Sequence, residues 1–131
     1  MSNPKRVLIA DAEPLIAGLI SRALQEVGYD TAQVYGGEEA IRWLSESPPP
    51  DLVICDYRMP GIDGAEVRDW MMEDRQLARI PFILMTGKTS SFKGWFEKPT
   101  NFTLFLTKPF QAQEVVIFAR RALEAEAGAS E

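Results

Sequence analysis

Five short runs of apolar residues, separated by segments with helical periodicity, constrain the fold of this chain more than any other feature. The runs are Val7–Ala10, Thr31–Val34, Leu52–Cys55, Phe82–Met85 and Leu104–Leu106. Four of them are nearly continuous in apolar residues, which is typical of strands buried on both faces of a parallel sheet. Thr31–Val34 is more polar, and we interpret it as an edge strand.

The segments between the runs carry the spacing of amphipathic helices. Between Pro14, which suits a first helical position, and Gly28, which suits a helix stop, apolar residues recur at helical spacing. Three further helices are predicted, over Gly37–Ser45, Ala65–Asp74 and Ala112–Ala125. This alternation predicts an α/β fold: a doubly wound parallel sheet with helices on both faces.

The segment between the last two predicted strands is the least regular. Phe92, Trp95 and Phe96 would form one apolar helical stripe, but Gly94 and Pro99 disfavour a regular helix. We therefore expect a short or irregular fourth helix there, with the three aromatic side chains serving local packing.

Composition places the chain among ordinary globular domains. It has 131 residues, of which 46% are apolar and 25% are charged. We expect one domain over residues 1–125 and a disordered polar tail over residues 126–131. The net charge of −5, with no basic cluster, argues against nucleic acids and anionic membranes as partners.

Histidine is absent, and the only cysteine is Cys55. The chain therefore has no histidine for catalysis, metal binding or phosphoryl carriage, and it cannot form an internal disulfide or a thiolate zinc site. Its cysteine usage fits a reducing compartment, so we expect a cytoplasmic protein. No stretch approaches the ~20 continuous apolar residues that a membrane-spanning helix needs.

Reactive side chains follow four of the predicted strands in the sequence. Asp11 follows the first strand, Asp56 the third, Thr86 the fourth and Lys108 the fifth. Because the carboxyl ends of parallel strands lie at the same edge of a sheet, we expect these residues to converge. An aspartate can attack phosphorus, Mg²⁺ prefers oxygen ligands, and a lysine and a hydroxyl can stabilise a phosphoryl group. The set therefore suits phosphoryl transfer.

With these residues in view, the chain resembles the receiver domain of two-component response regulators from about Lys5 to Leu123. The most specific block is Pro50–Gly64, which is similar to the phosphoacceptor strand and loop of that family. Three further blocks resemble its acidic strand end, its switch-threonine strand and its lysine segment: Val7–Pro14, Pro81–Thr86 and Phe105–Phe110. The resemblance implies a flavodoxin-like, three-layer α/β/α fold with strand order 2-1-3-4-5.

The resemblance also implies a role for each site residue. Asp56 would accept the phosphoryl group, and Lys108 and Thr86 would contact it. Asp11, Asp56 and the backbone carbonyl of Arg58 would hold Mg²⁺. We expect no enzyme activity beyond Mg²⁺-dependent self-phosphorylation from a phosphodonor and autodephosphorylation.

The function implied is that of a stand-alone response regulator receiver, a phosphoprotein of signal transduction. A sensor histidine kinase or phosphotransfer protein would phosphorylate it in a phosphorelay, and phosphorylation would switch its binding to a downstream protein. The Phe105 rotamer would report the state of the site, and a cis bond is expected before Pro109. We expect a monomer or a weak dimer.

One position departs from the family pattern. Ala12 stands where the family has a second acidic residue, which usually supplies a direct Mg²⁺ ligand. Glu13 follows, but we expect its side chain to point elsewhere unless the loop bends. Weakened Mg²⁺ affinity, slower phosphorylation and slower loss of phosphate are therefore expected.

Two alternative functions stay open. In the first, Ala12 marks a lost metal site, and the chain is a pseudo-receiver that docks partners independently of phosphorylation. In the second, the same fold binds a small ligand such as a flavin or acts as an enzyme, because fold does not fix function. Against the second, the loop Asp11–Pro14 is acidic and lacks a glycine-rich phosphate cradle.

The substitution Ala12→Asp is expected to tighten Mg²⁺ binding, because it restores a carboxylate at the position that lacks one. A Mg²⁺ titration followed by intrinsic tryptophan fluorescence measures the change. A wild-type affinity already in the range ordinary for the family would contradict this expectation.

Overall fold

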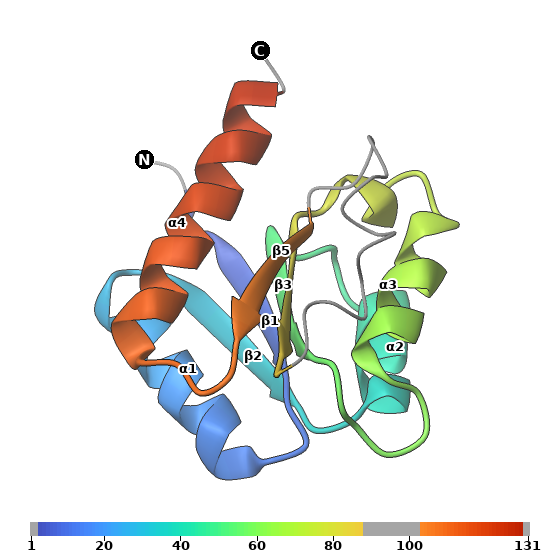
Figure 1. Ribbon diagram of the computed structural model, residues 1–131. Helices are drawn as coiled ribbons and strands as arrows, with labels where there is room; N and C mark the ends of the chain where they lie inside the picture. Colours follow the sequence, from blue (N-terminus) through green and yellow to red (C-terminus); the bar gives the residue numbers. More distant parts are fainter. Residues whose placement is uncertain (1–2, 88–102, 130–131) are drawn as a thin grey trace.

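The computed structural model describes residues 3–87 and 103–129 and contains a five-stranded parallel sheet (Figure 1). Its strands are β1 (Arg6–Ala10), β2 (Asp30–Val34), β3 (Leu52–Asp56), β4 (Phe82–Thr86) and β5 (Thr103–Thr107). They lie in the order β2-β1-β3-β4-β5, and every neighbouring pair is parallel. The expected flavodoxin-like strand order is confirmed, and the polar second strand lies at an edge as predicted.

Helices cover both faces of the sheet. The described helices are α1 (Pro14–Glu26), α2 (Gly37–Glu46), α3 (Gly64–Met72) and α4 (Ala112–Ala129), together with the 3-10 turn η1 (Leu77–Arg79). Helices α1 and α4 pack on one face, and α2 and α3 on the other, which gives three layers (Figure 1). The predicted three-layer arrangement is therefore confirmed. No helix in the described ranges is long and apolar enough to cross a membrane.

Two of the sequence-based expectations concern segments at the limits of the described residues. The expected irregular helix with Phe92, Trp95 and Phe96 lies outside them. Helix α4 continues to Ala129, past the expected domain end at residue 125, and residues 130–131 of the expected tail are outside the described ranges. The domain bounds stay a prediction.

The continuous apolar runs are explained by two cores, one on each side of the sheet. In β1, Val7 and Ile9 pack in the core under α1 and α4, whereas Leu8 and Ala10 pack in the core under α2 and α3. Successive side chains of a strand point to opposite faces, so a strand covered on both sides is apolar along its length, and in β3 and β4 only the last residue, Asp56 or Thr86, is polar. Every residue of β3 and β4 is buried, as this arrangement requires.

A capping box fixes the start of α3. The Asp63 carboxylate accepts a hydrogen bond from the Glu66 amide at 2.8 Å, and the Glu66 carboxylate accepts one from the Asp63 amide at 3.1 Å. This reciprocal pair satisfies two backbone donors that a helix end otherwise leaves unbonded. The α3 start therefore lies one residue before the predicted Ala65, at Gly64.

The side chain of Arg68, in the middle of α3, connects this helix to the start of β4. It is fully buried, donates a hydrogen bond through Nη1 to the Ile80 carbonyl at 2.9 Å, and lies over the Phe82 ring with its guanidinium carbon 5.2 Å from the ring centroid. Burial lowers the pKa of Arg68 to about 10. The helical pattern of the sequence gave no sign of this buried cation.

Glycine at position 64 lets the start of α3 lie directly against the end of β3. A Cβ atom there would overlap the backbone carbonyl oxygen of Asp56 and would lie 2.7 Å from Cδ1 of Leu84. By contrast, a Cβ atom at Gly18, in the middle of α1, would meet no atom within 4 Å. Gly64 and Gly18 therefore differ in what they contribute to the fold.

Gly64→Ala is expected to lower the free energy of unfolding by about 2 kcal/mol, because α3 must shift to admit the methyl group. Gly18→Ala is expected to raise it by up to about 1 kcal/mol, because alanine favours helix and the space is open. Urea unfolding of both variants and of the wild type measures the difference. Equal stability of the two variants would contradict the close approach of α3 to β3.

Candidate functional site

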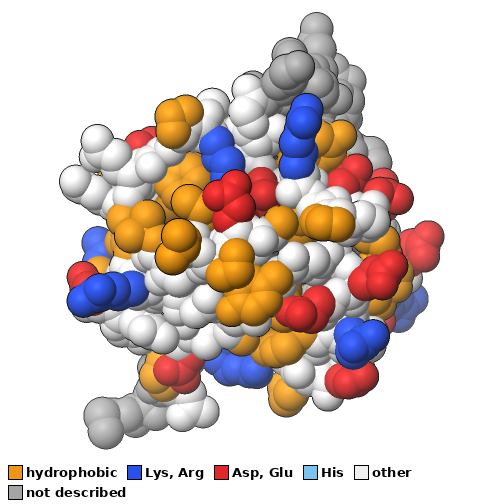
Figure 2. Space-filling model, turned by 90° about the horizontal axis from the view of Figure 1, so that it is seen from below, with side chains coloured by type: hydrophobic (Ala, Val, Ile, Leu, Met, Phe, Trp, Pro, Cys, Tyr) orange, Lys and Arg blue, Asp and Glu red, His pale blue; other side chains and the backbone are white. Residues whose placement is uncertain are grey.

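The carboxyl ends of the strands bring charged side chains together at one edge of the sheet. Figure 2 looks onto this end of the molecule, where acidic and basic side chains lie side by side with hydrophobic side chains around them. Asp11 directly follows β1, Asp56 ends β3, and Lys108 directly follows β5. Both carboxylates are buried, whereas Lys108 is partly exposed. The expected convergence places three residues from distant parts of the sequence in one site.

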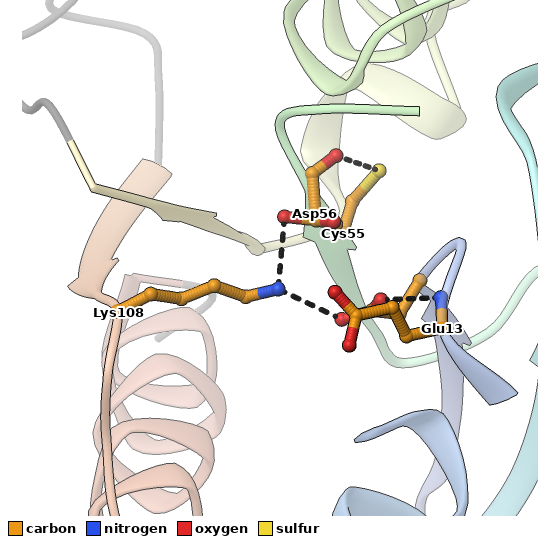
Figure 3. Close-up of polar contacts among 5 residues, drawn as sticks. Glu13, Cys55, Asp56 and Lys108 are labelled. Carbon is orange, nitrogen blue, oxygen red and sulfur yellow. Dashed lines mark hydrogen bonds and ion pairs between the residues drawn. The ribbon is translucent and has the colours of Figure 1, made fainter. Parts of the chain in front are cut away.

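Lys108 lies between the two carboxylates. Its Nζ is 3.1 Å from Oδ2 of Asp11 and 3.2 Å from Oδ1 of Asp56 (Figure 3). One ammonium group therefore offsets two carboxylates that would otherwise repel each other in a partly dehydrated site.

The charges at the site shift the pKa values of both partners. Burial, and secondly the negative charge of Asp11, raise the pKa of Asp56, and Lys108 opposes this rise. For Lys108, burial alone would lower the pKa, but the neighbouring Asp56 and Asp11 carboxylates outweigh burial, and its pKa is raised. The site therefore favours a charged lysine and holds the Asp56 carboxylate in surroundings that disfavour its charge.

Thr86 ends β4 beside these groups. Its side chain is buried, and its backbone carbonyl accepts a hydrogen bond from the Lys108 amide at 3.0 Å. The expected cis bond joins Lys108 and Pro109. Phe105 is half-buried and packs against the core under α2 and α3. The end of β4 is thus connected directly to the segment that carries Lys108.

Arg58 lies in the loop that joins β3 to α3. The backbone anchors this loop: the Tyr57 amide donates to the Met85 carbonyl at 2.8 Å, and the Gly64 amide donates to the Tyr57 carbonyl at 2.9 Å. Arg58, directly after Tyr57, is exposed. Its position is compatible with the expected backbone ligand, and that role stays a prediction.

Cys55, the residue before Asp56, is a buried part of the core. Its thiol donates a weak hydrogen bond to the Asp56 carbonyl at 3.5 Å (Figure 3). Burial, and secondly the charge of Asp56, raise the pKa of this thiol well above its ordinary value. A neutral, buried thiol is a poor nucleophile, so Cys55 serves packing.

The Glu13 side chain was expected to point away from these groups unless the loop after β1 bends. The loop after β1 bends, because the Glu13 amide donates a hydrogen bond to Oδ1 of Asp11 at 2.9 Å. Figure 3 shows the Glu13 carboxylate directed toward the ammonium group of Lys108 and the side of the site where Asp56 lies. Ala12 is half-buried and packs against the core under α2 and α3. The acidic side chain next to Ala12 thus turns into the site.

The donor atoms present fit a hydrated magnesium ion. Carboxylates of Asp11 and Asp56 and a backbone carbonyl are the hard oxygen ligands that Mg²⁺ prefers, and Mg²⁺ commonly keeps several waters. Within residues 3–87 and 103–129, no three histidine, cysteine, aspartate or glutamate side chains are grouped closely enough to hold a metal by themselves. Two carboxylates and one carbonyl leave coordination positions for the waters that Mg²⁺ commonly keeps.

Known proteins match this chain along most of its length. The family model described as the response regulator receiver domain matches residues 7–120. PhoP, the alkaline phosphatase synthesis transcriptional regulatory protein of Bacillus subtilis (strain 168), is 31% identical over 111 residues, which cover 85% of this chain and 45% of PhoP. The chain therefore spans less than half of the length of this relative.

Two of the solved structures that match this chain are covered over nearly their full length. The signal receiver domain of a signal transduction histidine kinase from Syntrophus aciditrophicus matches with a TM-score of 0.80 and 32% identity, over 92% of this chain and 91% of that chain. The chemotaxis response regulator CheY4 of Vibrio cholerae matches with a TM-score of 0.82 and 27% identity, over 92% of this chain and 100% of that chain.

Asp56→Asn is expected to raise the free energy of unfolding at pH 7 by about 1 kcal/mol, because it removes one of two like charges from a dehydrated site. Lys108→Met is expected to lower it by about 2 kcal/mol, because both carboxylates then lose their counter-ion. Chemical denaturation in EDTA measures both changes. A loss of stability in Asp56→Asn as large as that in Lys108→Met would contradict this account of the charges.

Proposed function

This chain belongs to the family of response regulator receiver domains, and on that premise we propose that it is a phosphorylation-controlled switch in two-component signalling. Receiver domains are generally signalling modules rather than enzymes. We propose that Asp56 is the phosphoacceptor. The observation that carries the proposal is the position of Lys108, whose Nζ lies 3.2 Å from the Asp56 carboxylate and 3.1 Å from that of Asp11.

The proposed reaction is the transfer of one phosphoryl group to a carboxylate. An oxygen of ionised Asp56 attacks the phosphorus of a phosphohistidine on the donor protein, and an acyl phosphate forms on Asp56. The bond between phosphorus and the histidine nitrogen breaks, and its electron pair stays on that nitrogen. With acetyl phosphate as donor, the phosphorus–oxygen bond breaks and acetate leaves.

Residues around Asp56 would offset the charge of the incoming group. The Lys108 ammonium would contact a phosphoryl oxygen, and the Thr86 hydroxyl would donate a hydrogen bond to another. Asp11, Asp56 and the backbone carbonyl of Arg58 would hold Mg²⁺, which when bound neutralises negative charge on the phosphoryl oxygens.

The link between Thr86 and Lys108 supports a route from the site to a partner surface. The Thr86 carbonyl accepts the Lys108 amide, so a movement of Thr86 toward a phosphoryl group would also move the end of β5. Phe105, within β5, is half-buried and so lies where its rotamer would be visible to a partner. We propose that this edge strand takes part in the change of surface that a downstream protein reads.

The exposed apolar side of α1 supports a protein as the phosphoryl donor. Leu15 is 89% exposed and Leu19 is 50% exposed, and Leu15 lies two residues after Glu13, which faces the site. Gly18, between them, leaves room for a close approach, since nothing lies within 4 Å of its missing Cβ. We propose that the helix of a histidine kinase or phosphotransfer protein that carries the phosphohistidine packs here.

Ala12 favours one alternative function. A receiver without the second acidic residue could have lost phosphorylation and retained only partner binding, as a docking module. This alternative and the proposed switch differ in one observable: whether partner binding depends on the phosphoryl group.

Incubation of the purified protein with acetyl phosphate and Mg²⁺ is expected to add one phosphoryl group, measured by intact mass. The gain is expected to be absent from Asp56→Asn and from a sample in EDTA, because the first lacks the nucleophile and the second lacks the cation. Asp69→Asn, at an exposed position of α3, is the matched control and should be phosphorylated like the wild type.

The opposite result would favour the docking module. If the folded wild-type protein gains no phosphoryl group under conditions that phosphorylate a known receiver, the switch function fails. If Asp56→Asn still gains one, the assignment of the phosphoacceptor is wrong.

A further inference from the structure

Glu13 occupies the N-cap position of α1 without capping the helix. Its backbone is extended, with φ −98° and ψ 108°, and its side chain makes no hydrogen bond to the amides of the first turn. Glutamate is not among the residues that favour this position, and the helix opens with Pro14, which has no amide hydrogen to satisfy. The Glu13 side chain is therefore not needed to stabilise α1.

The backbone of Glu13 aims its side chain elsewhere. Its amide donates to Oδ1 of Asp11 at 2.9 Å, while Oδ2 of the same carboxylate receives the Lys108 ammonium. This hydrogen bond turns the loop so that the Glu13 carboxylate faces the ammonium of Lys108 (Figure 3). Among the residues with described side chains, that carboxylate forms no hydrogen bond or ion pair, so it is available to a ligand.

An electrostatic effect agrees with this geometry. Burial is the main cause that raises the pKa of Asp56, the charge of Asp11 follows, and Glu13 adds a smaller rise in the same direction. The Glu13 carboxylate is therefore near enough for its charge to act on the proposed phosphoacceptor, although it is exposed to solvent.

We propose that Glu13 supplies the negative charge toward Mg²⁺ that Ala12 lacks, by accepting a hydrogen bond from a water bound to the ion. Mg²⁺ commonly keeps several waters, so a carboxylate just outside direct contact can still stabilise it. This inference rests on the proposed function, because it concerns the cation of that same site.

The test measures Mg²⁺ binding itself, without any phosphodonor. Calorimetric titration of Mg²⁺ into metal-free protein is carried out on the wild type, Glu13→Gln and the control Glu46→Gln. Glu46 is exposed at the end of α2, so the substitution Glu46→Gln removes the same charge away from the site. Glu13→Gln is expected to raise the dissociation constant roughly three- to tenfold, and Glu46→Gln less than about twofold.

Repeating the Glu13→Gln change in the Ala12→Asp variant distinguishes replacement of the missing carboxylate from a general effect of charge. In Ala12→Asp, the restored carboxylate takes over the missing role, so adding Glu13→Gln should then change the dissociation constant less than about twofold. If Glu13→Gln weakens Mg²⁺ binding equally with and without Ala12→Asp, the inference is wrong. It is also wrong if Glu13→Gln binds Mg²⁺ as tightly as Glu46→Gln does.

The possible failures are distinguishable. If the folded wild type binds no Mg²⁺ at all, the proposed function fails at its cation site and this inference falls with it. If the wild type binds Mg²⁺ and is phosphorylated while Glu13→Gln is unaffected, only the role of Glu13 is wrong. Circular dichroism of each variant checks that the fold is intact, which is expected for the exposed Glu13 and Glu46 and needs to be established for the half-buried Ala12.

Discussion

Two buried carboxylates at the edge of a parallel sheet need a cation, and this need connects most of the molecule. The sheet places Asp11 and Asp56 on adjacent strands that both end at this edge. Their counter-ion, Lys108, is 97 residues from Asp11 in the sequence and reaches the site only when β5 pairs with β4. The chemistry of the site therefore depends on the completed sheet, because no local segment of the sequence contains both the carboxylates and their lysine counter-ion.

The same constraint explains why such a site would respond to phosphorylation. Lys108 is shared between two carboxylates, and its backbone is hydrogen-bonded to Thr86. A phosphoryl group on Asp56 would bring oxygens that compete for the ammonium and for the threonine hydroxyl. Because β5 is an edge strand with a mixed burial pattern, a change at its end in the proposed switch would lie close to the surface and apart from the buried strands β1 and β3.

Most of the fold could be predicted because its signals are local. Continuous apolar runs identified strands covered on both faces, the more polar Thr31–Val34 segment identified an edge, and Pro14 marked the start of α1. The ends of α3 were placed less well, because its start depends on a hydrogen-bonded pair, Asp63 and Glu66, that the apolar pattern does not report. Arg68 was not foreseen as a buried residue, since a charged side chain in a helical pattern is ordinarily assigned to the solvent face.

The sequence by itself determined the alternation of strands and helices and the position of Asp11, Asp56, Thr86 and Lys108 at strand ends, because periodicity and strand length are properties of neighbouring residues. Only the tertiary structure decided that Lys108 bridges two carboxylates and that Glu13 turns toward the site. The direction of a loop side chain depends on the hydrogen bond its backbone makes, here to Asp11. That bond in turn depends on the strand packing that fixes the Asp11 carboxylate, and apolar periodicity carries no information about it.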